Sequence, residues 1–196
     1  MSRLMRTSEI IKRPVVTRGG EDIAQVKDII YSAGKGAVAG FTLAGRGIFA
    51  GPLPVGLPWA SVSALGNDAV MIADENALQP VETLTSAAQS EGGAGRNILG
   101  SRVLTDGGTD LGIVVDVVVQ VGQQGAEQCD VVGYEIESAD AGSAQAARML
   151  IPLPDTLAAS GEHLIVPTST TKFVQHDLAG FGAAIEEFRA HLEGQD

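Results

Sequence analysis

The sequence predicts an all-β protein built from two tandem, small antiparallel β-barrels and a short C-terminal helix. The composition is the first observation: aromatic residues make up 4% of the 196 residues and 25 residues are glycine, which favours an aliphatic core with many tight turns. The second is that a segment near the N-terminus recurs 88 residues later. The third is that each copy consists of short apolar runs separated by turn signals, without a long helical period between them.

An internal repeat organises the chain. Residues 10–29 align without a gap with residues 98–117, and Thr, Gly-Gly, Asp, Val and Asp recur in register. Three later segments also match, the last at an offset of 95: 38–41 with 132–134, 57–58 with 151–152, and 66–72 with 161–166. Because the offset grows only where loops tolerate insertions, we predict a first barrel, a linker, a second barrel and a C-terminal segment at 4–76, 77–96, 97–168 and 169–196.

The strands of each copy follow from the turn signals. Each copy opens with a β-branched run that ends at Gly-Gly, a dipeptide that supplies the positive φ of a hairpin. Two further strands should then pair antiparallel in each copy: 26–31 with 38–43, and 113–121 with 131–136. A unit this small cannot easily cover two sheet edges, so closure into a barrel is expected. For the same reason we expect the two units, related by an approximate twofold, to pack against each other or against a second chain.

A helix is predicted after the second barrel. Asp177 can cap it, and the apolar stripe Phe181, Ile185, Phe188 and Leu192 follows at helical spacing. The stripe should lie on the barrel. The opposite face is acidic rather than basic, which disfavours a role on a membrane surface.

Charge and targeting signals narrow the classes of function. The net charge of −11 disfavours a molecule that coats nucleic acid as a whole, but the charge is uneven: residues 1–76 hold eight Lys/Arg against seven Asp/Glu, and residues 77–196 hold five against seventeen. The chain has no run of 18 apolar residues and no secretory signal. A cytoplasmic protein without membrane insertion is expected, and the single Cys129 cannot form an internal disulfide.

The repeated residues resemble the PRC-barrel domain family. In the first copy the matching positions are Gly20, Asp28, Val38 to Phe41, 57–62 and 66–70; in the second they are Gly108, Gly112, Asp116, Val132-Gly133, Ile151-Pro152 and 161–166. The first copy departs from the pattern at Lys12 and Ala24, where the second has Gly100 and Gly112. The resemblance implies a six-stranded antiparallel barrel used as a docking module, as in the reaction-centre H-subunit cytoplasmic domain and the C-terminal domain of a ribosome maturation factor.

No residues signal catalysis. A nucleophile elbow is absent, the three histidines lie in unrelated contexts, and the glycine-rich strings 34–36 and 92–95 lack the features of a phosphate loop. We therefore expect no catalytic residue, no metal site and no cofactor. Asp28 and Asp116 interrupt equivalent strands; they could form a shared acid/base pair, but acceptance of hydrogen bonds from turn backbone is the better interpretation.

Two functions remain open. The favoured hypothesis is a non-catalytic adaptor that binds another protein or a second copy of itself as a homodimer. Its expected contact loop is 45–58, with Ile48 and Phe49 at the tip and Trp59 next to it; the tip could also plug the barrel end. The alternative is an RNA- or ribosome-associated factor, whose phosphate contacts would come from Arg3, Arg6, Lys12, Arg13 and Arg18.

Overall fold

Two compact units account for the chain in the computed structural model, which describes residues 3–32, 36–47, 50–90, 98–122, 128–138, 148–153, 158–159 and 163–194. Unit 1 comprises residues 1–3, 7–95 and 120–130, and unit 2 comprises residues 4–6, 96–119 and 131–196. Residues 4–6 and the C-terminal segment group with unit 2, and residues 120–130 group with unit 1. The predicted division into barrels and linker stays a prediction.

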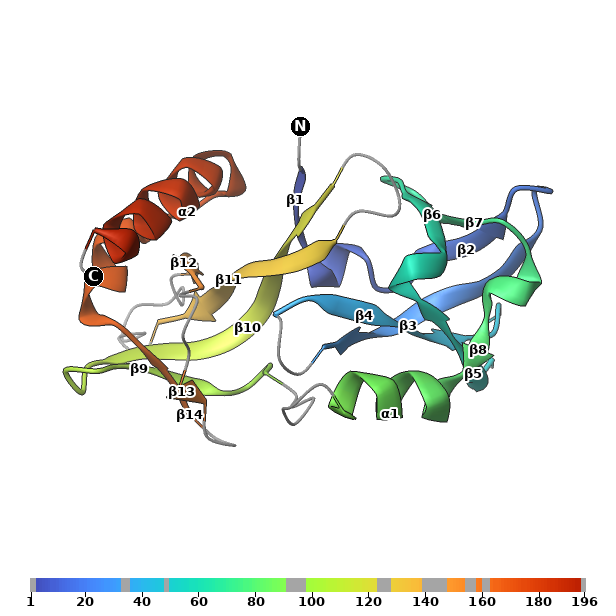
Figure 1. Ribbon diagram of the computed structural model, residues 1–196, viewed down its shortest axis with the longest axis horizontal. Helices are drawn as coiled ribbons and strands as arrows, with labels where there is room; N and C mark the ends of the chain where they lie inside the picture. The colour runs from blue at the N-terminus through green and yellow to red at the C-terminus, as the bar shows by residue number, and fades with distance from the viewer. Residues whose placement is uncertain are drawn as a thin grey trace. The chain divides into compact units, whose positions relative to one another are not determined.

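Unit 1 contains a seven-stranded sheet with the order β6-β7-β2-β3-β4-β5-β8 (Figure 1). Its strands are β2 (Pro14–Thr17), β3 (Asp22–Tyr31), β4 (Val38–Ala44), β5 (Pro52–Pro58), β6 (Val62–Leu65), β7 (Val70–Ile72) and β8 (Gln79–Pro80). Three short 3₁₀ helices and one α-helix complete it: η1 (Thr7–Glu9), η2 (Trp59–Ser61), η3 (Glu75–Ala77) and α1 (Val81–Ser90).

Unit 2 contains the second seven-stranded sheet, with the order β12-β11-β10-β9-β14-β13 and with β1 paired to β10. Its strands are β1 (Arg3–Arg6), β9 (Arg102–Thr105), β10 (Asp110–Val121), β11 (Cys129–Glu137), β12 (Arg148–Pro152), β13 (Ala158–Ala159) and β14 (His163–Val166). The helices η4 (Thr168–Phe173) and α2 (Leu178–Glu193) follow.

The two sheets share one succession of strands. The order β7-β2-β3-β4-β5 in unit 1 corresponds to β14-β9-β10-β11-β12 in unit 2. In each, one pair is parallel: β2 with β7, and β9 with β14. The prediction of purely antiparallel sheets was therefore wrong, because the chain crosses over before its last core strand and returns beside the first. Closure of either sheet into a complete barrel stays a prediction.

The first hairpin of each unit uses the same backbone hydrogen bonds at an offset of 88. The N–H of Lys12 donates to the carbonyl of Val26, and that of Gly100 to the carbonyl of Val114, both at 2.8 Å. The turns match as well: Thr17 N–H donates to Glu21 O, as Thr105 N–H does to Thr109 O. The side-chain hydroxyl of each threonine accepts from the backbone N–H four residues later, at 3.1 and 2.9 Å.

The pairing registers match too, with one correction to the sequence alignment. The first two strands shift register between Val15 and Val16 in unit 1 and between Asp110 and Gly112 in unit 2, at equivalent positions. In the parallel pair, Val15 faces Val70 and its counterpart Val103 faces Leu164. The offset in this last strand is therefore 94 rather than 95. A shift of one residue would have placed the buried residues on the opposite face of the strand.

A helix follows the sheet in both units. The segment predicted as a linker contains β8 and α1, whose Leu84 and Ala88 are buried one helical turn apart. This part of the linker prediction was wrong, because α1 packs its short apolar stripe on the strands. Glycine leaves room for this contact, since a Cβ at Gly40 would lie 3.0 Å from Leu84 Cδ2. In unit 2, Phe181 of α2 occupies the same relation to Gly133. The segment 91–97 lies outside the described residues.

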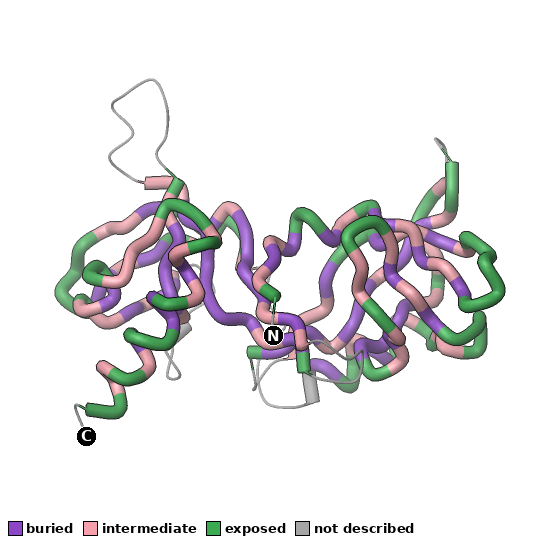
Figure 2. The backbone as a smooth tube through the Cα atoms, turned by 90° about the horizontal axis from the view of Figure 1, so that it is seen from above, coloured by how far each residue is buried: buried purple, intermediate pink, exposed green. Residues whose placement is uncertain are grey.

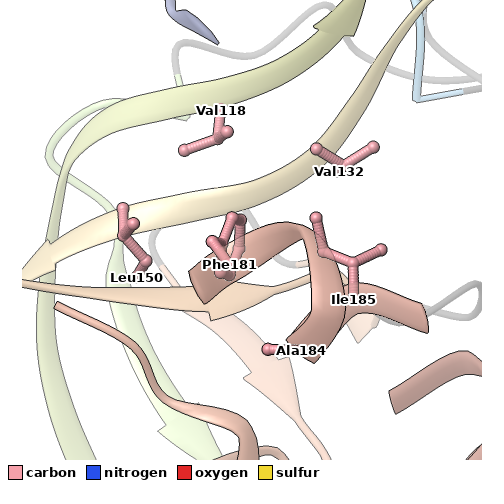
Figure 3. Close-up of a cluster of buried hydrophobic side chains, with 6 residues drawn as sticks. All are labelled: Val118, Val132, Leu150, Phe181, Ala184 and Ile185. Atoms are coloured by element: carbon pink, nitrogen blue, oxygen red, sulfur yellow. The ribbon is translucent and has the colours of Figure 1, made fainter. Parts of the chain in front are cut away.

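The predicted C-terminal helix and its buried stripe are confirmed. The carboxylate of Asp177 caps α2 by accepting from the N–H of Gly180 at 2.9 Å. Phe181, Ile185 and Phe188 are buried, whereas Leu192 is only partly covered. Figure 3 shows the cluster to which the helix contributes: Val118, Val132, Leu150, Phe181, Ala184 and Ile185. Figure 2 shows exposed and less exposed residues alternating along the helix that leads to the C-terminus.

Candidate binding surfaces

The basic residues of the N-terminal region do not form one surface. Arg13 is buried, and its guanidinium donates to the backbone carbonyls of Glu9, at 2.7 Å, and of Gly66. Burial lowers the pKa of Arg13, and the nearby charge of Arg3 lowers it further, while Glu9 and Asp68 act in the opposite direction. Arg13 therefore joins η1 to the turn between β6 and β7, and its hydrogen bonds are made within the fold.

Arg3, Lys12 and Arg18 are exposed. Lys12 and Arg18 lie at opposite ends of β2, a four-residue strand that spans about 13 Å. Lys12 also has a left-handed backbone, with φ of 70°, at the position where unit 2 has Gly100 with φ of 86°. Lys12 and Arg18 are thus separated by the length of this strand.

Arg6 belongs to unit 2 and is paired there. Its Nε donates to Glu135 Oε2 at 3.0 Å and its Nη2 donates to Glu135 Oε1 at 3.1 Å, which makes a two-pronged ion pair. The Glu135 side chain is only 7% exposed. Because a buried carboxylate needs a cation or several donors nearby, Arg6 is a structural partner of β11.

The loop predicted as a contact site is shorter than expected. Residues 52–58 form β5, which pairs with β4 and β8, so the prediction of a loop was wrong over this range. Proline is tolerated there because β8 provides only two residues on the far side of the strand. Ile48 and Phe49, the predicted tip, lie outside the described residues. Trp59 is 8% exposed and packs edge-on against Phe41, with ring centroids 6.0 Å apart.

Asp28 and Asp116 occupy the same place in their strands but differ in environment. Each Oδ1 accepts from the N–H of the next residue, Ile29 or Val117, at 2.8 Å. The partner is strand backbone rather than the turn backbone we expected, and in β3 it lies where the register with β4 shifts between Val26 and Asp28. Asp28 is exposed, whereas Asp116 is buried. These hydrogen bonds give both carboxylates a role in the backbone of their own strands.

Two exposed apolar side chains in unit 2 were missed by the sequence reasoning. Leu99 is 40% exposed and Ile113 is 43% exposed; they are the large hydrophobic residues left open on the described part of the chain. Their segments are joined, since the N–H of Gly100 donates to the carbonyl of Val114. The counterparts at an offset of 88, Ile11 and Gln25, are partly covered. The signal available in the sequence was an apolar residue at each position, but periodicity alone could not show which face is left open.

The thiol of Cys129 and the phenol of Tyr134 stay protonated at neutral pH. Burial raises the pKa of Cys129 to about 12, with a smaller contribution from the charge of Asp130. Burial likewise raises the pKa of Tyr134 to about 12. A thiol in this state is a poor nucleophile.

The described residues contain neither a cluster of metal ligands nor a helix that could cross a membrane. Among those that the structure describes, no three His, Cys, Asp or Glu side chains gather into a group that could hold a metal ion. The helices of this part of the chain are each too short or too polar to cross a membrane. The absence of a metal site from the whole protein stays a prediction.

Part of the chain matches a known family model. Residues 3–79 match the PRC-barrel domain. The PRC-barrel match begins with β1, which lies in the sheet of unit 2, and ends with β8 of unit 1. The match does not extend to the second repeat, and no curated protein matches the chain at a significant level.

Proposed function

We propose that the protein is a non-catalytic protein-binding adaptor made of two PRC-type domains. The observation that carries the proposal is the PRC-barrel match of residues 3–79, because the resemblance to this family implies a docking module. The second domain is proposed from the backbone. Its first hairpin repeats the hydrogen bonds and the register shift of the first at an offset of 88, and its strand order is the same.

Leu99 and Ile113 are the proposed contact surface for a protein partner. Apolar side chains that remain open on a folded domain are favoured contact points because their burial releases ordered water. The half of the chain that contains them is acidic as a whole, since residues 77–196 carry five Lys/Arg against seventeen Asp/Glu. A partner with apolar side chains surrounded by basic ones is the best complement to this surface.

RNA is the competing partner, and its support is weaker. Of the five basic residues assigned to it, Arg6 and Arg13 are held by Glu135 and by backbone carbonyls. Arg3, Lys12 and Arg18 remain as exposed cations: Arg3 begins β1, Lys12 precedes β2 and Arg18 follows it.

Capture from an extract of the source cells tests the two partners against each other. The full chain is compared with the variant Leu99→Ser/Ile113→Thr and with the matched surface variant Lys12→Gln/Arg18→Gln, each in nuclease-treated and untreated extract. We expect the full chain to capture a protein in both treated and untreated extract. The amount captured should fall at least tenfold with Leu99→Ser/Ile113→Thr and stay unchanged with the basic variant.

The opposite pattern would overturn the proposal. Capture that disappears with nuclease, or that falls only when Lys12 and Arg18 are replaced, assigns the function to RNA. The basic variant changes exposed residues, so its unfolding free energy should stay within about 0.5 kcal/mol of the wild type. The apolar variant loses partly covered side chains and should lose about 1–2 kcal/mol, which leaves it folded.

A further inference from the structure

The N-terminal strand β1 is an added strand in the sheet of unit 2. β1 pairs with β10, and its residues 4–6 group with unit 2, whereas the chain from residue 7 to residue 95 groups with unit 1. The ion pair that holds it joins residues 129 positions apart in the sequence. The sheet therefore already accepts one short extended segment from a distant part of the chain.

Leu4 and Arg6 make contacts of two different kinds in unit 2, and Met5 between them is buried. Leu4 packs against the buried cluster that contains Val118 and Phe181, and lies close to α2, where a Cβ at Gly182 would be 3.7 Å from Leu4 Cδ1. Met5 is 1% exposed. Arg6 forms the two-pronged ion pair with the buried Glu135.

These contacts define a chemical pattern. The backbone ladder binds any extended segment, and the subsites select its side chains: two apolar residues, then one that can reach a buried carboxylate with two parallel donors. Arginine satisfies the last subsite better than lysine, because its planar guanidinium matches both carboxylate oxygens.

We propose that this place in unit 2 is a strand-binding site that takes an extended peptide with the pattern apolar–apolar–arginine, presented by a partner protein. In the chain by itself, β1 occupies the site. The proposal rests on the protein-binding function and adds a partner class to it. Because β1 is tethered, its effective concentration is high, and a free peptide competes only when β1 is weakened or released.

The test uses the full chain with β1 disabled by Leu4→Ser/Arg6→Glu and a fluorescein-labelled peptide of residues 1–9. Fluorescence anisotropy should show saturable binding to this variant, at least tenfold tighter than to the wild-type chain. A peptide carrying Arg6→Glu should bind at least tenfold more weakly. Adding Glu135→Gln to the variant should weaken binding of the arginine peptide. The difference in affinity between the two peptides should become smaller.

Hydrogen exchange in the wild-type chain is a second test, which applies even if the variant loses the fold of unit 2. In the wild-type chain, the amides of Met5 and Arg6 should exchange faster than those of β9 and β14, which reports release of β1 from a sheet that stays folded. Exchange of β1 only together with the whole sheet would overturn the proposal, as would a folded variant that does not bind the peptide. Either failure leaves the Leu99 and Ile113 surface untouched, because capture there does not depend on β1.

Discussion

The first hairpins of the two units share their backbone hydrogen bonds and register shift but have different residues at two key positions. Their hydrogen bonds and register shifts coincide at an offset of 88, yet Lys12 stands opposite Gly100 and Ala24 opposite Gly112. At the first pair the backbone is left-handed in both units, so Lys12 adopts a conformation that favours glycine. At the second pair only Gly112 has positive φ, at 128°. Hydrogen bonds preserve the path of the chain, whereas close neighbours decide where glycine is required.

The largest expected effect comes from Gly112→Ala in unit 2. A Cβ there would lie 1.9 Å from the carbonyl oxygen of Glu137, and the positive φ adds strain. We expect a loss of about 3–5 kcal/mol in the unfolding free energy of unit 2. Hydrogen exchange of peptides from β9 to β12 measures it within the full chain.

Ala24→Gly is the matched control for this position in unit 1. Ala24 is fully buried without positive φ, so the change should cost about 1 kcal/mol through lost burial and added backbone freedom. Equal effects of the two substitutions would mean that the hairpins do not differ at this position.

Alanine substitutions at the glycines beneath the two helices should have a smaller effect on the unfolding free energy, and the effect should differ between the units. A Cβ at Gly133 would lie 2.4 Å from both the Ile151 carbonyl oxygen and the Phe181 ring, whereas at Gly40 it would lie 2.4 Å from the Leu57 carbonyl oxygen and 3.0 Å from Leu84. A buried aromatic ring moves aside less easily than a leucine methyl group. We expect Gly133→Ala to cost about 2–3 kcal/mol and Gly40→Ala about 1–2 kcal/mol.

Denaturant titrations of the two variants, with exchange of α2 and α1 peptides as local readouts, measure this difference. A larger loss for Gly40→Ala would show that the leucine of α1 is held more rigidly than the phenylalanine of α2.

The smallest effect, and the only stabilising one, is expected at Lys12. Lys12→Gly removes a side chain from a left-handed position, so unit 1 should gain about 0.5–1 kcal/mol after the entropy cost of glycine. The reverse change in unit 2, Gly100→Ala, should cost about 1 kcal/mol. Thermal unfolding followed by circular dichroism detects both, and destabilisation by Lys12→Gly would show that the lysine side chain makes a contact worth more than the strain.

A second difference between the units concerns which strand belongs to which sheet. The PRC-barrel match includes residues 3–6, but β1 pairs with β10 of unit 2. A family match follows the order of residues along the chain, and strand pairing follows the burial available in space. The Arg6 and Glu135 pair shows how large the separation can be, since neither residue has a sequence neighbour that predicts the other.

The sequence by itself determined the local elements of this protein. Gly-Gly turns, β-branched runs and the Asp177 cap with its apolar stripe depend on residues close together in the chain, and they predicted the hairpins and α2 correctly. The gapless repeat likewise predicted equivalent hydrogen bonds in the two hairpins.

Only the tertiary structure decided the contacts between distant segments. The parallel pairing of β2 with β7, the use of α1 as a cover, the burial of Arg13 and the place of β1 beside β10 all depend on which surfaces meet after folding. Such contacts offset the chain entropy of long loops by burying apolar area and pairing charges, and no local pattern in the sequence encodes that balance.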